Sequence, residues 1–296
     1  MRTITVQGVT RKLGWHRDRP HRVRQHFSAS YSAMRALPPA DNHLVSRMSE
    51  FVRKDTGELA LPFDQGPLGS CTFNWYAAAA LFAHHVGNKP LGFTPSRLGG
   101  YYGEREREGT TDSDAGAEPI DGVKTMEEDG LGPEDMTGDP ANWPYDVDRF
   151  TEKPPRAFYT FAKDHQALIE SDVEQSLCQI KAAIMQGLPV GFGFNVFESF
   201  MSDEVANTGI VPMPGPDEEN VGGHMTGALA FDDLGAGNGG FAPIPRCIVG
   251  LNSWGGSWGG KLVIAGVTYP GLFFMPYEYI LSREQASDHR VIQLTE

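Results

Sequence analysis

The pattern of hydrophobic and polar positions changes from helical in the first half of the chain to extended in the second half. After a Gly/Pro-rich loop, the run from Ala77 to Leu81 consists of good helix formers, and no Gly or Pro interrupts it before Gly87. This pattern predicts a helix from about Ser70 to Val86. Similar reasoning predicts three more helices, which are Thr94-Pro95-Ser96 to about Arg107, Pro119 to Gly130, and Asp172 to Gln186.

Apolar runs in the second half are shorter and are bounded by turn residues, which is typical of strands. They predict strands at Phe158–Phe161, at Val190–Val196, from His224 onward, at Cys247–Leu251, at Lys261–Val267 and at Gly271–Pro276. The fold class is therefore α+β. We expect an N-terminal arm or short pro-like segment over residues 1–60, a helical lobe over 61–156 and a β-rich lobe over 157–296.

Within the arm, residues 3–9 alternate weakly and predict a short strand. Residues 14–22 are polar around one isolated aromatic side chain, and they predict an extended segment that Trp15 anchors. Whether the arm blocks a cleft or only braces the fold stays open at this point.

Cys71 stands in the first turn of the predicted central helix. Exposed N–H groups and the positive end of the helix dipole favour the thiolate there, so Cys71 is a candidate nucleophile. Gln65, six residues earlier, carries an amide that could donate to an oxyanion, and such a donor typically contributes ~3 kcal/mol of transition-state stabilisation. A buried, inert cysteine is the alternative for an isolated residue of this type.

A base and a group to orient it stand far downstream. His224 follows two glycines at the start of an apolar run, and Asn252 ends another apolar run just before Ser253-Trp254-Gly255. The order Gln, Cys, His, Asn, with about 150 residues between Cys and His, is the pattern of papain-type enzymes.

On these residues the sequence resembles the papain-like cysteine peptidases. The motifs that carry the resemblance are Gln65, Gly69-Ser70-Cys71, Gly223-His224 and Asn252-Ser253-Trp254-Gly255. Other stretches are similar to a bacterial and viral branch of this family, so that the likeness covers about residues 60–280: Phe93-Thr94-Pro95-Ser96, Asp114-Ala115-Gly116-Ala117, Asn142-Trp143-Pro144-Tyr145-Asp146 and Pro189-Val190-Gly191-Phe192-Gly193-Phe194. The resemblance implies a two-lobed fold, with a cleft between a helical lobe and an antiparallel, β-barrel-like lobe.

The resemblance also implies hydrolysis of peptide bonds through an acyl-thioester. Cys71 would be the nucleophile, held as a thiolate beside a His224 imidazolium, and Asn252 would orient the ring of His224. Gln65 would hold the oxyanion together with the backbone N–H of Cys71. Trp254 would shield the bond between His224 and Asn252. The expected substrate contacts are Gly116, Gly222, Gly223 and Trp254, with Tyr277 as a further candidate.

The composition of this 296-residue chain favours a globular protein whose partner is a peptide or protein substrate. No apolar run approaches the ~20 residues of a membrane span, and the N-terminus lacks the apolar core of a signal peptide. We therefore expect a cytoplasmic protein without membrane contact. The net charge of −13 argues against general nucleic-acid binding. One basic stretch is the exception, and we expect it to dock as a strap on the acidic body: Arg11, Lys12, Arg17, Arg19, Arg22 and Arg24.

Three cysteines agree with a reducing compartment. Leu68 stands where secreted papain relatives usually carry a disulfide-bonded cysteine, so we expect that disulfide to be absent. Cys178 and Cys247 are expected to be buried apolar residues. No Cys/His set has the spacing of a zinc site, and we expect neither a metal nor a cofactor.

Two other functions stay open. One is a dedicated processing enzyme or ligase, whose acyl-thioester forms on a single peptide precursor. The other is a peptide-binding module without catalysis, which would have no need of a thiol, a base and an orienting group together.

Overall fold

Helix α3 (Cys71–Val86) is the central element of the computed structural model, which describes residues 3–20, 25–166 and 168–294. Every residue of α3 from Cys71 to His84 is buried, as expected of a helix that is apolar on all sides. Ser70 stands at its N-cap and Gly87 at its C-cap, so the predicted bounds of this helix are confirmed.

The remaining helices are short. They are α1 (Tyr31–Arg35), α2 (His43–Arg47), α4 (Arg97–Glu108), α5 (Pro119–Lys124) with a π-helical turn at Thr125–Asp129, α6 (Arg156–Ala162), α7 (Leu177–Met185), α8 (Asp203–Thr208) and α9 (Tyr277–Leu281). Short 3-10 turns lie at Met48–Glu50, Val147–Arg149, Lys163–His165, Glu198–Met201 and Ala236–Asn238.

The strands form one large sheet and a separate hairpin. They are β1 (Thr3–Val6), β2 (Val9–Lys12), β3 (His26–Phe27), β4 (Ala40–Asp41), β5 (Leu168–Val173), β6 (Val190–Phe197), β7 (Asn220–Asp232), β8 (Cys247–Leu251), β9 (Gly260–Ile264), β10 (Val267–Pro276) and β11 (Ala286–Leu294). The hairpin is β1-β2, and the large sheet has the order β3-β5-β11-β6-β7-β8-β10-β9, with β4 paired to β7.

The sheet is antiparallel except for the β3–β5 pair. Its order ends at β3 and β9, and the side chains of Lys261 and Val263 on β9 are exposed to solvent. The sheet is therefore open. The α+β class is confirmed, whereas the predicted barrel-like closure is wrong, because closure requires the two edge strands to pair.

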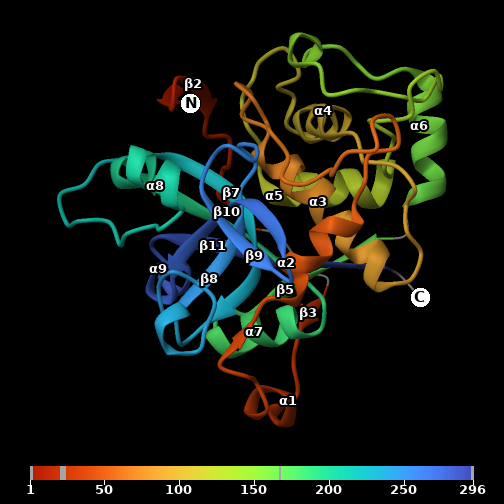
Figure 1. Cartoon of the computed structure of the whole chain (residues 1–296). Coiled ribbons are helices and arrows are strands. Elements are labelled where there is room, and N and C mark those ends of the chain that lie inside the picture. The colour runs from red at the N-terminus through yellow and green to blue at the C-terminus, as the bar shows by residue number, and fades with distance from the viewer. Residues whose placement is uncertain (1–2, 21–24, 167, 295–296) are drawn as a thin grey trace.

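Helix α3 lies between helices α4 and α5 and the sheet (Figure 1). It packs on α4 and α5 on one side and on β7 and β11 on the other. Close approach to the sheet depends on Gly191 and Gly227, because a Cβ atom at either would lie within about 2 Å of the Trp75 side chain. The central helix thus carries its first residue, Cys71, to the junction of the two layers. The predicted division of the chain at residues 60 and 156 stays a prediction.

Two predicted elements are wrong. Phe158–Phe161 is part of helix α6, and its Phe158 packs with Leu68, Leu98 and Trp143. The region predicted as a helix from Asp172 to Gln186 begins with the end of β5, and helix α7 starts only at Leu177. Both errors have the same cause, since a short apolar run fits a helix and a strand equally well until its partners are known.

The N-terminal segment leaves the β1–β2 hairpin and passes between the helices and the sheet (Figure 1). From here on, the arm means residues 11–19 only, which are one part of the N-terminal segment predicted over residues 1–60. Trp15 forms a parallel bridge with Ala117, which lies before α5. The backbone N–H of Trp15 donates to the carbonyl of Gly223 on β7 at 3.1 Å. The arm therefore contacts both layers.

Basic side chains dock the arm on acidic partners, as predicted. Arg11 pairs with Asp64, Lys12 pairs with Asp114 at 2.7 Å, and Arg19 pairs with Asp121 at 2.8 Å and with Glu118 at 3.2 Å. Arg22 and Arg24 of the same basic stretch lie outside the described residues.

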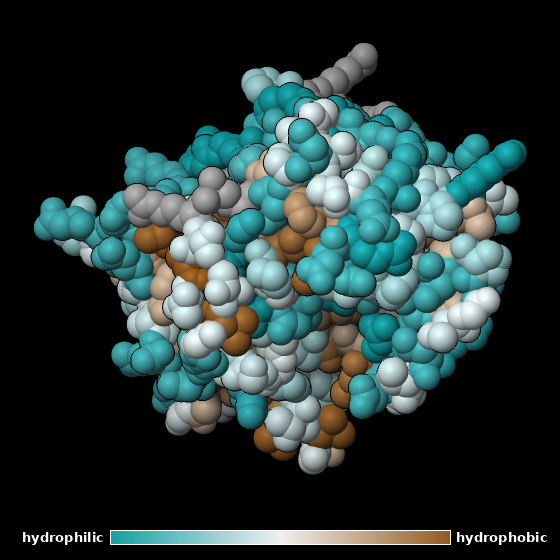
Figure 2. Space-filling view, turned by 90° about the horizontal axis from the view of Figure 1, so that it is seen from above, coloured by the Kyte–Doolittle hydropathy of each residue, from teal (hydrophilic) through white to brown (hydrophobic). Residues whose placement is uncertain are grey.

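Hydrophilic residues predominate on the face shown in Figure 2, and apolar residues form small separate groups. Among the described helices none has the length and apolar character that crossing a membrane requires. Cys247 is buried as predicted, but Cys178 is exposed, so the prediction of a buried apolar residue is wrong there. Cys178 stands second in helix α7, where its side chain faces outward.

Candidate active site

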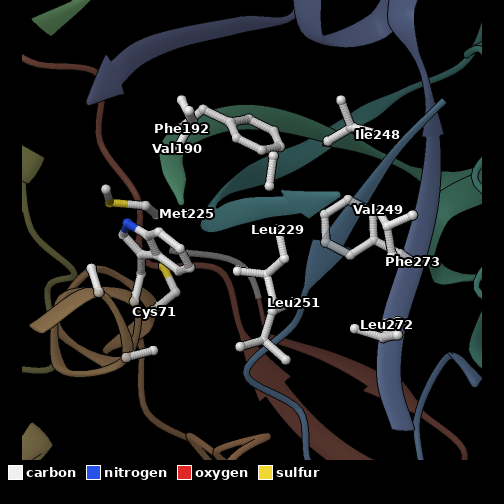
Figure 3. Packing of buried hydrophobic residues seen from close by; sticks show 14 of the residues in the cluster. Cys71, Val190, Phe192, Met225, Leu229, Ile248, Val249, Leu251, Leu272 and Phe273 are labelled. Atoms are coloured by element: carbon white, nitrogen blue, oxygen red, sulfur yellow. The ribbon is translucent and has the colours of Figure 1, made fainter. Parts of the chain in front are cut away.

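Cys71 is the first residue of α3 and is fully buried at the edge of the main core. The backbone N–H groups of Met225, Gly14 and Thr72 lie near its sulfur, where they favour the thiolate. Figure 3 shows Cys71 beside Met225 of strand β7. Met225 directly follows His224, the predicted base, so the two candidates lie on neighbouring parts of α3 and β7.

The ring of His224 is held from one side by a carboxamide. Its Nε2 donates to Oδ1 of Asn252 at 2.8 Å, and the same oxygen accepts the N–H of Ser253 at 2.8 Å. The other ring nitrogen, Nδ1, is buried and has no hydrogen-bond partner among the described residues. The sequence prediction that Asn252 bonds a ring nitrogen of His224 therefore agrees with the geometry.

Tryptophan rings cover the His224–Asn252 pair. The Trp254 ring lies 5.1 Å from the His224 ring, and Trp258 packs against Trp254 at 5.1 Å. Both indoles are buried, so water has no direct access to the bond between His224 and Asn252 from this side. Trp254 thus lies where the expected shield of this bond would lie.

Burial shifts both titrating groups toward their neutral forms. It raises the pKa of the Cys71 thiol to about 12, although N–H groups on the sulfur act in the opposite direction. It lowers the pKa of His224 to about 4, against the effect of Asn252, and the positive charge of Arg11 lowers this pKa further. Both shifts favour the neutral thiol and the neutral imidazole, because burial removes the hydration that a charged form needs.

Gln65 is fully buried and its amide is already in use. Its Nε2 donates to the carbonyl of Leu68 at 2.7 Å and to the carbonyl of Lys12 at 3.1 Å, while its Oε1 accepts from the hydroxyl of Ser253 at 2.7 Å. The donor predicted for an oxyanion thus points at a carbonyl oxygen of the arm. Ser253, which fixes its orientation, was not singled out by sequence reasoning.

The arm fills the space in front of Cys71. The N–H of Ala117 donates to the carbonyl of Gly14 at 2.8 Å, and the N–H of His16 donates to the carbonyl of Ala117 at 3.1 Å. A Cβ atom on Gly14 would lie 1.7 Å from the carbonyl oxygen of Gly69, so only glycine passes this close to the nucleophile loop. The arm therefore lies between the nucleophile loop and Ala117, where the resemblance places the cleft.

All four predicted substrate contacts adjoin the arm. A Cβ atom at Gly116 would lie 2.2 Å from the carbonyl oxygen of Gly14, and Gly222 and Gly223 face Leu13 and Trp15 in the same way. The carbonyl of Trp254 accepts from the guanidinium of Arg11 at 3.0 Å. Tyr277, the further candidate, lies elsewhere. Its hydroxyl donates to Asp233 at 2.8 Å.

Sequence reasoning missed several residues that hold the arm. Asp114 accepts from Gly69 N–H at 2.9 Å and from Lys12 at 2.7 Å, so one carboxylate ties the nucleophile loop to the arm. Asp64 and Asp288 bind Arg11 and Trp15. The signal for Asp114 was available, since this residue opens the Asp114–Ala117 motif, but nothing in the sequence marked Asp288.

The proteins that this chain is similar to are named as peptidases. The chain is 37% identical over 238 residues to a peptidase C1-like protein of Acanthamoeba polyphaga mimivirus, and the match covers 78% of this chain and 68% of that protein. The crystal structure of xylellain, a cysteine protease from Xylella fastidiosa, matches with a TM-score of 0.75 at 28% identity. That match covers 100% of this chain and 99% of the other.

A more distant structure, proCathepsin B S9 from Trypanosoma congolense, matches with a TM-score of 0.62 at 12% identity over 96% of this chain and 85% of that one. At this identity the likeness concerns the fold alone. No family model matches the chain. On the mimivirus relative and xylellain, the chain belongs to the papain-like cysteine peptidases.

Proposed function

We propose that the chain hydrolyses peptide bonds with Cys71 as nucleophile, His224 as acid–base, Asn252 as orienting group and Gln65 as oxyanion donor. One observation carries the proposal. The thiol at the start of a buried helix lies beside the strand of an imidazole whose far nitrogen is 2.8 Å from a carboxamide oxygen. A thiol, a base and an orienting group in that relation form the arrangement that nucleophilic catalysis requires.

Each group has a defined step in this mechanism. The Cys71 thiol gives its proton to His224, its sulfur attacks the peptide carbonyl carbon, and the carbonyl oxygen takes up the electron pair next to the amide of Gln65. His224 gives a proton to the leaving amine, and a thioester remains on Cys71. Water then loses a proton to His224 and attacks the thioester, which releases the carboxylic acid and restores the thiol.

The proposed enzyme is latent as long as the arm is in place. The backbone of Gly14 occupies the position in front of the sulfur, and the carbonyl of Lys12 takes the donor of Gln65. The charge of Arg11 also opposes protonation of His224. Entry of a substrate therefore requires that residues 11–15 leave the cleft.

The proposal is tested by peptide cleavage in a full-length chain whose arm is weakened. The double variant Leu13→Gly/Trp15→Gly, called the open-arm variant below, removes the two arm side chains that face Gly222 and Gly223. We expect it to cleave unstructured peptides, with products identified by mass spectrometry, and we expect added Cys71→Ala to abolish cleavage. Added Cys178→Ala is the matched control and should leave the rate unchanged, because that cysteine is exposed on α7.

Circular dichroism shows whether each variant is folded. A folded open-arm variant that cleaves no peptide, or one that still cleaves without Cys71, would contradict the proposed function. Added primary amines separate hydrolysis from acyl transfer, because only transfer yields amide products.

A further inference from the structure

Trp15 is an arm residue with a large side chain that enters the body of the protein near Cys71, and it is only 6% exposed. Its indole lies against Gly193 on β6 and Gly223 on β7. A Cβ atom at Gly193 would lie 2.0 Å from the ring, and one at Gly223 would lie 2.3 Å from it. Neither glycine has a positive φ angle, so the backbone does not require glycine at either position. Their absent side chains provide room for a large ring.

The carboxylate of Asp288 lies against the one polar atom of the ring. The indole Nε1 donates to Oδ2 of Asp288 at 3.1 Å, and the same oxygen accepts from the Ser287 hydroxyl at 3.0 Å. Asp288 has a φ angle of +58°, a conformation that costs energy for a residue with a side chain. It lies where the pairing of β11 with β6 shifts register, and such irregularities redirect side chains.

The arm residue in this pocket directly follows the arm residue that lies against the Cys71 sulfur. Gly14, the neighbour of Trp15, presents its backbone to the Cys71 sulfur. The N–H of Trp15 itself donates to the carbonyl of Gly223, the residue before His224. A peptide bound along the same two edges would place one of its side chains where the indole lies.

We propose that the pocket formed by Gly193, Gly223 and Asp288 selects the substrate, and that it selects a tryptophan side chain through the bond from the indole N–H to Asp288. This inference rests on the proposed peptidase function. Gly193 and Gly223 set the size of the accepted side chain, and Asp288 is the specificity-determining residue because it distinguishes an indole from an aromatic ring without a donor.

The first experiment uses the arm itself as the ligand and needs no substrate. In full-length chains, Trp15→Phe keeps an aromatic ring but removes the N–H, and Asp288→Gly removes the acceptor at a φ angle that suits glycine. The readout is the rate at which iodoacetamide alkylates Cys71. A hydrogen bond to a charged acceptor predicts that Trp15→Phe speeds alkylation about tenfold in the chain with Asp288. In the Asp288→Gly chain the same substitution should change nothing.

The second experiment measures selection directly. The open-arm variant is given otherwise identical fluorogenic peptides that carry Trp, Phe, Arg or Ala at each of the three positions before the scissile bond. We expect kcat/KM to be about tenfold higher for Trp than for Phe at one of these positions, and we expect Asp288→Gly to remove this preference. Asp288→Asn should retain part of it, because the amide oxygen still accepts.

Two results would overturn the inference. One is equal use of Trp and Phe in the chain with Asp288. The other is a preference for Arg, which would make Asp288 a charge partner for basic side chains. If no peptide is cleaved by any variant, the proposed function fails, whereas the alkylation experiment still decides whether the pocket distinguishes indole from phenyl.

Discussion

At the scale of single residues, the two groups with the largest mechanistic importance are also among the most deeply buried. Cys71 and His224 have no exposed surface, and burial disfavours the charged form of each. Arg11 of the arm contributes to this state because its charge disfavours the imidazolium, whereas the backbone N–H of Gly14 acts against it by favouring the thiolate. Withdrawal of the arm would rehydrate both groups and so favour the ion pair that attack on a carbonyl needs.

Gln65 gives a prediction that separates transition-state stabilisation from structure. In the open-arm variant, Gln65→Ala should lower kcat about 100-fold, the typical cost of one oxyanion donor. Alkylation of Cys71 by iodoacetamide forms no oxyanion, so its rate should stay within about twofold. Parallel loss of both rates would make Gln65 a structural residue, which its bonds to Leu68 and Ser253 would then explain.

Asn252 gives a second prediction at this scale. Asn252→Ala removes the acceptor of His224 Nε2 but leaves the imidazole itself. We expect kcat in the open-arm variant to fall by less than the ~10²–10⁴-fold that loss of a general acid–base costs, and His224→Ala in the same background provides that reference. An Asn252→Ala chain that is as inactive as His224→Ala but fully folded would mean that Asn252 does more than orient the ring.

The catalytic candidates could be read from the sequence because their spacing and neighbours are specific as a set. Cys71 begins a clear helix, His224 lies in β7, which starts four residues before the predicted strand, and Asn252 directly follows β8, whose bounds were predicted. Asp288 could not be found in this way. Its position depends on a register shift between strands about ninety residues apart and on a ring from the other end of the chain.

At the scale of elements, the arm is held by ion pairs at the cleft edge and by one inserted ring. Lys12 pairs with Asp114, whose side chain is only 5% exposed, whereas the side chain of Asp64, the partner of Arg11, is 52% exposed. The carboxylate of Asp114 also accepts the N–H of Gly69 in the nucleophile loop. Release of the arm therefore breaks contacts that also order the loop before α3.

Lys12→Ala should loosen the arm without touching the catalytic groups. We expect Cys71 in the full-length chain to react with iodoacetamide several-fold faster, because partly buried charge pairs contribute on the order of 1 kcal/mol. Lys153→Ala is the matched control, since it removes a lysine from an exposed pair with Glu106 that is remote in sequence from the arm. Equal rates in wild type and Lys12→Ala would show that this pair does not hold the arm.

Elements with a long, clear period were predictable, and short ones were not. Helix α3 and strand β8 match their predictions at nearly every residue, because their apolar runs are bounded by Gly, Asn or Ser. Helix α6 was predicted as a strand, because four residues with three aromatic side chains carry no decisive period. The path of the arm was not predictable either, since its binding partners are spread over the whole chain.

At the scale of the whole molecule, two buried histidines link stability to pH. The pKa is lowered to about 4 by burial for both His224 and His289, against 6.5 for an unperturbed histidine. As pH falls below 6.5, the unfolded chain binds protons that the folded chain does not, so the free energy of unfolding decreases until about pH 4. Each histidine should cost about 2 kcal/mol between pH 7 and pH 5.

His289→Gln isolates this effect, because His289 stacks on Phe192 and has no proposed part in the chemistry. Urea unfolding at pH 7 and pH 5 should show a loss of stability that is about 2 kcal/mol smaller in His289→Gln than in wild type. An identical loss in both chains would mean that His289 is not buried in its neutral form.

The measurement that tests the account most directly is the pH dependence of Cys71 alkylation by iodoacetamide in wild type and in the open-arm variant. An ion pair with His224 predicts that the open-arm variant reacts rapidly on a plateau well below the ordinary thiol pKa of about 8.5, and that the plateau disappears with His224→Ala. Wild type should react slowly at neutral pH, because its thiol pKa is raised to about 12. If both chains follow one curve that rises near pH 8.5, as a free thiol does, then neither the catalytic pair nor its cover by the arm exists.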